Sequence, residues 1–166
     1  MLWQLRNRND SQCRELADRH YNRQSVGAPG FVPPGRCCVF YCETVTGRAF
    51  WVTSWPFAEF TQHAWGGAWV CSAFRNEGAA LSSDLITQAV SATRHVFGAP
   101  PALGFVTFVD RGKTRAKRDP GYCYKMAGWR PCGRTKTRRL HALQLLPADM
   151  PDPVAPVGAQ YDIWGG

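Results

Sequence analysis

Four residues at the ends of expected helices and strands have side chains that can move protons. His20 and Tyr21 are adjacent at the end of an amphipathic stretch, Asp110 directly follows an apolar run, and Tyr124 lies in a short helical segment. A histidine or a carboxylate can take a proton from an amine, and a tyrosine hydroxyl can donate to a leaving group. We therefore treat all four as candidate catalytic residues.

Each of these residues also has a purely structural interpretation. Asp110 could cap a turn after the strand, and Tyr124 could be a packed helix aromatic. His20 and Tyr21 could be an exposed histidine beside a packed tyrosine. The residue types alone leave both interpretations open.

The stretch from Trp69 to Trp129 predicts the order β-α-β-α. We expect a strand over residues 68–74, a polar break over 75–78, a helix over 83–97, a strand over 103–109 and a short helix that ends at 128–129. The apolar residues of the longer helix recur at helical spacing, and Ser82 or Ser83 is expected to cap it. The β-branched and aromatic run before Asp110 is typical of a buried strand, whose carboxyl end is a common place for active-site residues.

The flanking segments add a helix, a hairpin and a terminal strand. The patterns predict a helix over 11–23 capped by Asp10 or Ser11, a hairpin of strands 37–42 and 48–55, and a strand over 140–146. The aromatics of segment 57–67 either cover the core or stack on bases. A chain of 166 residues can bury one core. We expect one domain over 1–146 and an extended, loosely held proline-rich tail over 147–166.

The positive charge is concentrated in one segment. The formal net charge is +8, and eleven Lys or Arg residues but one acid lie between Arg111 and Arg139. This distribution indicates a polyanionic partner, although a solvated charged hairpin would give the same pattern. The candidate nucleic-acid-binding residues are Arg111, Lys113, Arg115, Lys117, Arg118, Arg134, Lys136, Arg138 and Arg139.

The seven cysteines and the hydropathy pattern argue for a reduced, soluble protein. The cysteine number is odd and no C-x-x-C pair occurs, so a disulfide framework is not expected. Cys38 and Cys42 with Cys123 or Cys132 could bind zinc, but buried thiols are the simpler interpretation. No apolar run reaches the roughly 20 residues that span a bilayer, and the N-terminus has no signal-peptide core. We expect no membrane partner and a cytoplasmic location.

The order helix, hairpin, strand, helix, strand, helix, strand resembles that of the GNAT (N-acyltransferase) superfamily. In that family the strand before the main helix splays from its neighbour, and N–H groups at the helix start bind the pyrophosphate of the acyl donor. The resemblance implies a single α/β domain with a mixed central sheet and flanking helices, and acetyl-CoA or a related acyl donor. The corresponding loop, 75–83, departs from the family signature Q/R-x-x-G-x-G/A because it has one glycine. Its donor-binding candidates are Arg75, Ser82 and Ser83.

Within that superfamily the chain is most similar to the phage Mom-type DNA-modification proteins. The likeness is carried in order by His20-Tyr21 with Arg23, Arg75, Ser82-Ser83, Asp110, and Gly121, Tyr124 and Trp129. It implies transfer of a carbamoylmethyl-type group to the N6 amine of adenine in double-stranded DNA, which protects phage DNA from restriction in the host cytoplasm. It also implies iron, for which His20, Tyr21 and Asp110 would be the ligands.

Adenine in a duplex must be extruded before its amine can react, and Trp55, Trp65 or Tyr124 could then hold the base. Two other function classes fit the same sequence. One is an acyl-CoA-dependent N-acyltransferase acting on a small-molecule or protein amine. The other is a non-enzymatic nucleic-acid-binding protein, which needs only the basic segment.

Overall fold

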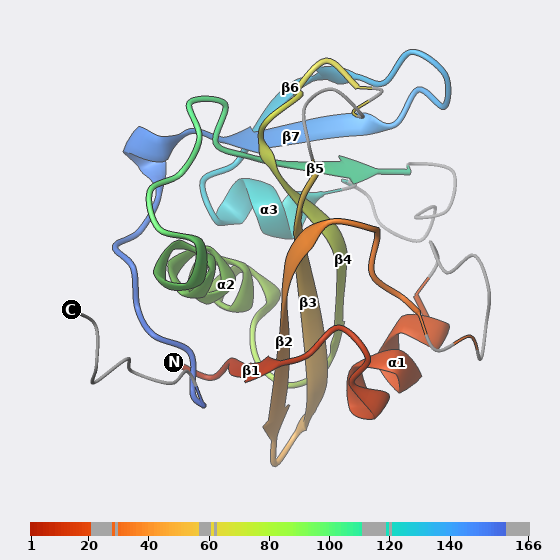
Figure 1. Cartoon of the computed structure of the whole chain (residues 1–166), viewed down its shortest axis with the longest axis vertical. Coiled ribbons are helices and arrows are strands. Elements are labelled where there is room, and N and C mark those ends of the chain that lie inside the picture. Colours follow the sequence, from red (N-terminus) through yellow and green to blue (C-terminus); the bar gives the residue numbers. More distant parts are fainter. Residues whose placement is uncertain are drawn as a thin grey trace.

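One mixed sheet organises the domain. The computed structural model describes residues 1–20, 28, 30–56, 61, 63–110, 119 and 121–158. Seven strands lie in the order β1-β2-β3-β4-β5-β7-β6 (Figure 1). Neighbouring strands are antiparallel except β4 and β5, which are parallel. The expected single α/β domain with a mixed sheet and flanking helices is confirmed for the described residues.

The elements follow one another in the expected alternation of strands and helices. The strands are β1 (Gln4–Arg6), β2 (Arg36–Thr44), β3 (Gly47–Trp55), β4 (Trp69–Glu77), β5 (Phe105–Val109), β6 (Arg130–Arg134) and β7 (His141–Leu145). The helices are α1 (Ser11–Asp18), α2 (Ser82–Phe97) and α3 (Tyr122–Met126), followed by a short 3-10 helix, η2 (Pro147–Asp149).

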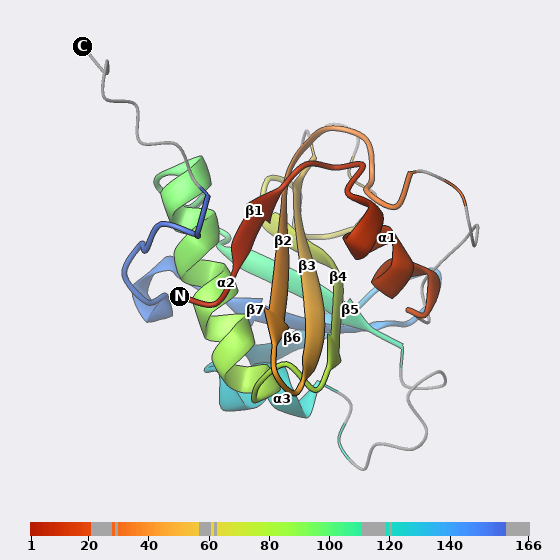
Figure 2. The same cartoon turned by 90° about the horizontal axis from the view of Figure 1, so that it is seen from below.

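Helices cover both faces of the sheet. Figure 2 shows α1 on one side of the strands and α2 on the other. Successive strand residues point to opposite faces, so Phe50 of β3 packs in the cluster that contains Leu16 of α1. Trp51, the next residue, packs in the larger cluster that contains Leu85 of α2 and Tyr124 of α3. Two apolar cores therefore hold α1 and the pair α2 and α3 against opposite faces.

The hairpin and the main helix agree with the sequence patterns, but the polar break after β4 was placed too early. β2 and β3 form the expected antiparallel pair, and α2 begins one residue before the expected start. The strand β4 continues to Glu77 because Phe50 and Ala49 of β3 pair with Arg75 and Asn76. The expected break over 75–78 is therefore wrong for its first three residues.

The N-terminal helix is shorter than expected. Asp10 caps it as expected, because its carboxylate accepts a hydrogen bond of 2.9 Å from the Cys13 backbone N–H. The helix α1 ends at Asp18, whereas the pattern predicted residue 23. Residues 21–27 lie outside the described part of the chain.

Two strands at the margins of the sheet have no clear sequence signal. β1 has three residues and pairs with β2. β6 contains Pro131 and Gly133 and pairs only with β7, where the register shifts between those two residues. Proline is compatible with an edge strand because its missing N–H faces away from the ladder. The expected terminal strand over 140–146 corresponds to β7.

The tail is bound to the domain over residues 147–158. The Leu5 backbone N–H donates to the Val157 carbonyl and the Val157 N–H donates to the Trp3 carbonyl, both at 2.9 Å. Arg94 of α2 donates to the Pro151 carbonyl at 2.7 Å. The expectation of a loosely held tail is wrong for this segment, and residues 159–166 lie outside the described part of the chain.

The buried thiols agree with the interpretation of reduced cysteines. All seven cysteines are free, and Cys38 and Cys42 lie in the core beneath α2. Among the residues that the structure describes, no helix is both long and apolar enough to cross a membrane.

Candidate functional site

The parallel strands β4 and β5 separate halfway along β4. They pair only through Trp69, Val70 and Cys71 of β4. Directly after Cys71, the register between β3 and β4 shifts and leaves Ser72 as an extra residue without a partner on β3. Such a bulge bends and twists its strand. The remainder of β4 therefore has no strand partner on its β5 side among the described residues, and an opening forms at the carboxyl end of β5.

A pocket of about 190 Å³ occupies this opening. Its walls are formed by His20 just after α1, Ser82 at the start of α2, and Cys71 to Asn76 of β4. The end of β5 and α3 with the glycine before it complete the lining. Pockets for whole drug-sized ligands are usually ~300–1,000 Å³. The volume therefore fits a small reacting group and its acceptor, while the rest of a larger donor would extend outside.

The structure brings four of the candidate residues to this pocket, namely His20, Arg75, Ser82 and Tyr124. Asp110 follows β5 and is half-buried, but it does not line the pocket, and neither does Ser83. Tyr21 and the basic residues Arg111, Lys113, Arg115, Lys117 and Arg118 lie outside the described part of the chain. Arg134, Lys136, Arg138 and Arg139 are exposed at the end of β6 and in the turn to β7.

Tyr124 is held in the wall of the pocket as a neutral phenol. Its ring lies 5.2 Å from the Trp129 ring, and its hydroxyl lies 3.4 Å from the Cys71 sulfur. Burial raises the pKa of Tyr124 well above its usual value of 10. Burial also raises the pKa of the Cys71 thiol to about 12. Tyr124 is therefore suited to donate a hydrogen bond, whereas Cys71 is not activated as a nucleophile.

Gly121 allows α3 to lie close enough to the sheet for Tyr124 to reach the pocket. Its φ of +79° is in the left-handed region, and a Cβ at this position would lie 2.5 Å from the Leu143 side chain. A larger residue would strain this backbone conformation and would force the buried Leu143 side chain to shift. The glycine before α3 thus contributes to the position of the phenol three residues later.

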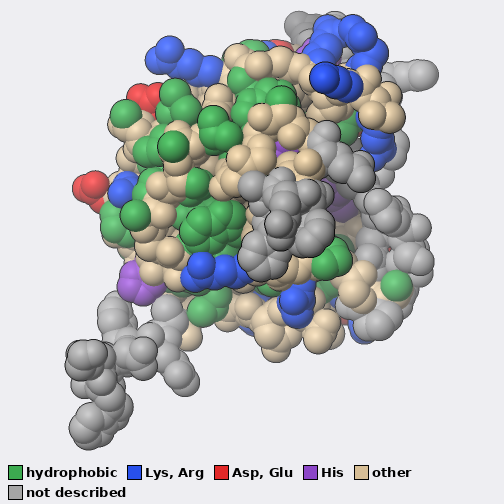
Figure 3. Space-filling model, turned by 45° about the horizontal axis from the view of Figure 1, so that its top comes forward, with side chains coloured by type: hydrophobic (Ala, Val, Ile, Leu, Met, Phe, Trp, Pro, Cys, Tyr) green, Lys and Arg blue, Asp and Glu red, His purple; other side chains and the backbone are tan. Residues whose placement is uncertain are grey.

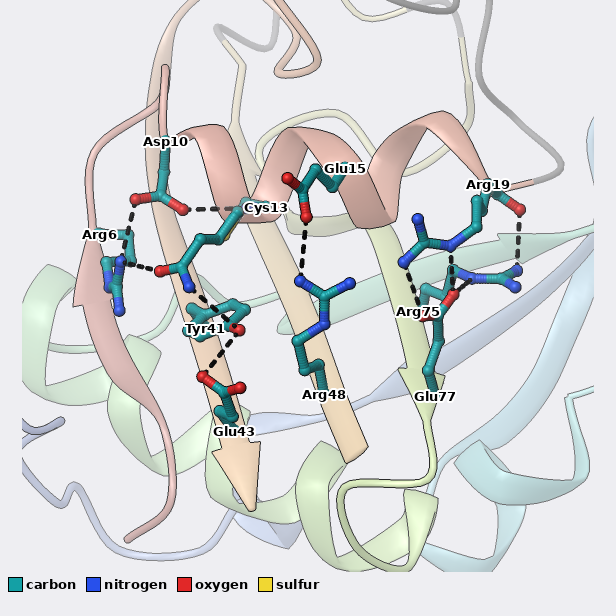
Figure 4. A network of polar contacts seen from close by, with 11 residues as sticks. Arg6, Asp10, Cys13, Glu15, Arg19, Tyr41, Glu43, Arg48, Arg75 and Glu77 are labelled. Carbon is teal, nitrogen blue, oxygen red and sulfur yellow. Dashed lines mark hydrogen bonds and ion pairs between the residues drawn. The ribbon is translucent and has the colours of Figure 1, made fainter. Parts of the chain in front are cut away.

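An ion-pair cluster fixes the end of α1 on β4, next to His20 (Figure 4). Arg19 donates two hydrogen bonds of 2.7 Å to the Glu77 carboxylate, and Arg75 donates a third of 2.7 Å. Arg75 also donates to the Arg19 carbonyl at 2.8 Å. The hydrogen bond from Arg19 holds the pKa of Glu77 down at about 2, and Arg75 adds to this effect. The cluster therefore fixes the backbone at Arg19, directly before the half-buried His20.

Replacement Glu77→Gln is expected to destabilise the protein by about 1 kcal/mol at neutral pH. A partly exposed ion pair contributes little by itself, but the Glu77 carboxylate forms two, with Arg19 and Arg75. Because the pKa of Glu77 is lowered from 4.5 to about 2 by folding, its contribution is complete above pH 4.5 and is lost as the pH falls toward 2. The difference in free energy of unfolding between wild type and variant should therefore be constant from pH 8 to 6 and shrink below pH 4.5.

Urea unfolding followed by tryptophan fluorescence at each pH measures this difference. Glu43→Gln is the matched control, because Glu43 is exposed on β2 and, within the described part of the chain, accepts a single hydrogen bond, from Tyr41 at 3.2 Å. A difference for Glu77→Gln that is as large at pH 3 as at pH 7 would show that the carboxylate is not held ionised by the two arginines.

Asn76 shapes the start of α2 and is a site residue that the sequence did not reveal. Its amide donates to the Ala80 carbonyl at 2.7 Å and to the Ser82 hydroxyl at 2.9 Å. The residue at the N-cap of α2 is Leu81, with no side-chain cap, so the expectation that Ser82 or Ser83 caps the helix is wrong. No described side chain therefore caps the first turn, and Ser82 lines the pocket instead.

The described residues do not provide a metal site of three ligands. No group of three or more His, Cys, Asp or Glu side chains in the described part of the chain is close enough to bind one ion. Asp110 does not share the pocket with His20, and Tyr21 lies outside the described residues. The zinc site considered for Cys38 and Cys42 is therefore not formed by the described residues. The iron site that the resemblance implies stays a prediction, because Tyr21 lies outside the described residues.

No protein-family model, curated protein or solved structure matches the chain. A function for this chain is therefore inferred from the geometry of the pocket and from the charge around it.

Proposed function

We propose that the protein is a GNAT-like transferase that attaches a small acyl-derived group to the N6 amine of adenine in double-stranded DNA and so protects the DNA from restriction. One observation carries the proposal. His20 and Tyr124, from elements on opposite faces of the sheet, both line the pocket where β4 and β5 separate. A proton acceptor and a hydrogen-bond donor on either side of a small cavity are what group transfer to an amine requires.

The arrangement of strands supports the GNAT-like assignment. β4 and β5 are the only parallel pair among the described strands, α2 connects them, and they separate after three residue pairs. In GNAT proteins the strand before the main helix splays from its neighbour. The unpaired backbone of β4 from Ser72 onward can hydrogen-bond an extended donor, because exposed strand edges accept further partners.

The start of α2 supports binding of the phosphates of an acyl donor such as acetyl-CoA. The first turn of a helix has unpaired N–H groups and partial positive charge. Here that turn adjoins the pocket through Ser82 and has no side-chain cap. Arg75 already binds Glu77 and the Arg19 carbonyl. We therefore assign the donor phosphates to the N–H groups of α2, and to Arg75 the role of positioning His20.

The proposed reaction follows from the two groups in the pocket. The N6 nitrogen of adenine attacks the electrophilic carbon of the donor, a C–N bond forms, and the bond to the leaving group breaks. His20 accepts the proton that N6 loses. Tyr124 donates a hydrogen bond to the leaving group, and its raised pKa keeps it in the donating form at neutral pH. An aryl amine is a weak nucleophile, so both contributions are needed.

The exposed basic turn supports a polyanionic acceptor. Arg134, Lys136 and Arg138 are exposed and have no acidic partner among the described residues. Lysines and arginines in such a position bind phosphates without reading sequence. A conventional N-acyltransferase for a small amine would use the same pocket but not this turn, and a non-enzymatic DNA-binding protein would use the turn but not the pocket.

Plasmid DNA from cells that produce the protein should resist restriction enzymes whose sites contain adenine. The DNA is freed of protein by protease and phenol before digestion, because a bound protein would otherwise block cleavage. Enzymes whose sites contain only G and C are the control and should cut normally. Complete cutting at adenine-containing sites, in DNA from cells with abundant folded protein, would contradict DNA modification and favour one of the two alternatives.

A further inference from the structure

Three aromatic side chains form a cluster at the edge of the pocket. The rings of His63 and Phe108 are 4.9 Å apart, and the Trp65 ring lies 5.8 Å from Phe108 and 6.0 Å from His63. All three residues are half-buried, so each keeps some exposed surface. Phe108 also lines the pocket. The cluster therefore connects the reaction site to the surface.

The cluster continues directly onto the basic β6–β7 hairpin. Phe108 pairs with Ala142 of β7, and Ala142 pairs with Gly133 of β6, so the three lie in one row across the sheet. A Cβ on Gly133 would lie 3.6 Å from the Trp65 ring, which shows that the indole rests on this residue. Arg134 is the next residue along β6.

The hairpin beside the cluster has positive charge without nearby acids. Residues 130–146 include five Lys or Arg residues and no Asp or Glu. Those residues, Arg130, Arg134, Lys136, Arg138 and Arg139, are all exposed. In Figure 3 the largest group of Lys and Arg side chains on the face shown is at the upper right, the side on which the β6–β7 turn lies in Figure 1.

We propose that His63, Trp65 and Phe108 stack against an unpaired DNA base beside the pocket, while the arginines and the lysine of the β6–β7 hairpin bind the phosphates that flank it. Aromatic rings next to a basic track are how proteins bind single-stranded nucleic acid, since every base has a face for stacking and every nucleotide a phosphate. The adjacent pocket makes this the point where an extruded base would enter.

The protonation and the orientation of the His63 imidazole are suited to stacking on a base. The Trp65 backbone N–H donates to Nδ1 of His63 at 3.0 Å, so this nitrogen carries no proton and its lone pair accepts the hydrogen bond. Burial lowers the pKa of His63. The imidazole is therefore neutral at pH 7 and presents an aromatic face, and the hydrogen bond to Trp65 fixes the two rings relative to each other.

The inference rests on the proposed function only for the identity of the nucleic acid. Its test measures binding alone, so it needs no acyl donor and no transfer reaction. Fluorescence anisotropy of the full chain is measured with two labelled 12-nucleotide DNA strands, one with bases and one with abasic sugar-phosphate throughout. Trp65→Leu should weaken binding of the strand with bases about 10-fold and leave binding of the abasic strand unchanged. Trp65→Phe, which keeps a ring, should retain most of the affinity.

Tyr122→Leu is the control, because Tyr122 is an aromatic residue of α3 that is 57% exposed and lies outside the cluster. Equal binding of the strand with bases by wild type and Trp65→Leu would overturn the proposal, and so would an equal loss for both strands. Tighter binding of an RNA strand of the same sequence would assign the surface to RNA instead. Each of these outcomes leaves the restriction experiment unaffected, so failure of this inference and failure of the proposed function can be told apart.

Discussion

The variant Tyr124→Phe is expected to form the modified deoxyadenosine at least 100-fold more slowly than wild type, with little change in folding. The substitution removes one oxygen and keeps the ring. Hydrogen-bond or proton donation to a leaving group contributes roughly 10²–10⁴-fold to enzymatic rates. The rate is measured by digesting treated plasmid DNA to nucleosides at successive times and quantifying the new species by mass spectrometry.

The expected effect is on the rate and not on folding, because the Tyr124 ring contributes more to the packing of the core than its hydroxyl does. The hydroxyl lies 3.4 Å from the Cys71 sulfur, which accepts hydrogen bonds weakly, and it also interacts with the Thr107 side chain. The ring, by contrast, packs against Trp51, Phe74 and Trp129. Loss of the oxygen should therefore lower the rate of transfer while the ring maintains the core.

Tyr122→Phe is the matched control for this experiment. It makes the same chemical change two residues earlier in α3, at an exposed position that does not line the pocket. We expect wild-type rates from this variant. Equal rates for Tyr124→Phe and wild type would show that the phenol is only a packed aromatic, which is the structural interpretation that the sequence left open.

The triple variant Arg134→Gln, Lys136→Gln and Arg138→Gln is expected to bind double-stranded DNA about 100-fold more weakly at ~0.1 M salt. Each phosphate contact releases condensed counterions, so the logarithm of affinity falls with the logarithm of salt concentration by nearly one unit per contact. Removing three contacts should also make the slope of log affinity against log salt concentration less negative by about three. Anisotropy with a labelled duplex at several salt concentrations measures both quantities.

These three residues are chosen because they can be changed without a structural cost. They are exposed, whereas Arg139 has a φ of +51° and is therefore left unchanged. The triple variant Arg8→Gln, Arg14→Gln and Arg36→Gln removes the same charge elsewhere and is the control. If both variants weaken binding equally, net charge rather than the hairpin attracts the DNA.

Sequence patterns located the elements that build the pocket because those elements have strong local signals. The periodic apolar residues of α2 and the β-branched run of β5 fix their own secondary structure, and Asp10 is a strong helix cap. The pairing of β2 with β3 follows from the short turn between two apolar runs. These signals predicted Asp110 at the carboxyl end of β5, but Asp110 does not line the pocket.

The wall of the pocket was harder to anticipate because tertiary pairing overrides local preference there. Arg75, Asn76 and Glu77 have the composition of a loop, yet pairing with β3 keeps them in β4. The bulge at Ser72 depends on register between strands, which no local pattern encodes. Asn76 therefore emerged as a site residue only from its contacts with Ala80 and Ser82.

The edge of the sheet shows the same limitation. Pro131 and Gly133 disfavour a strand, so β6 was not expected, and the stacking of Trp65 on Gly133 could not be foreseen. Trp65 and Tyr124 were both proposed from sequence as aromatics that might hold a base. The structure separates them, because Tyr124 is buried in the pocket wall while Trp65 lies against the basic hairpin.

The most direct test of the account is the mass spectrum of nucleosides from plasmid DNA produced together with the wild-type protein. The account predicts a new deoxyadenosine derivative whose added mass identifies the transferred group, with deoxyguanosine, deoxycytidine and thymidine unchanged. Deoxyadenosine of ordinary mass throughout, from cells that contain abundant folded protein, would contradict the claim that this pocket modifies adenine in DNA.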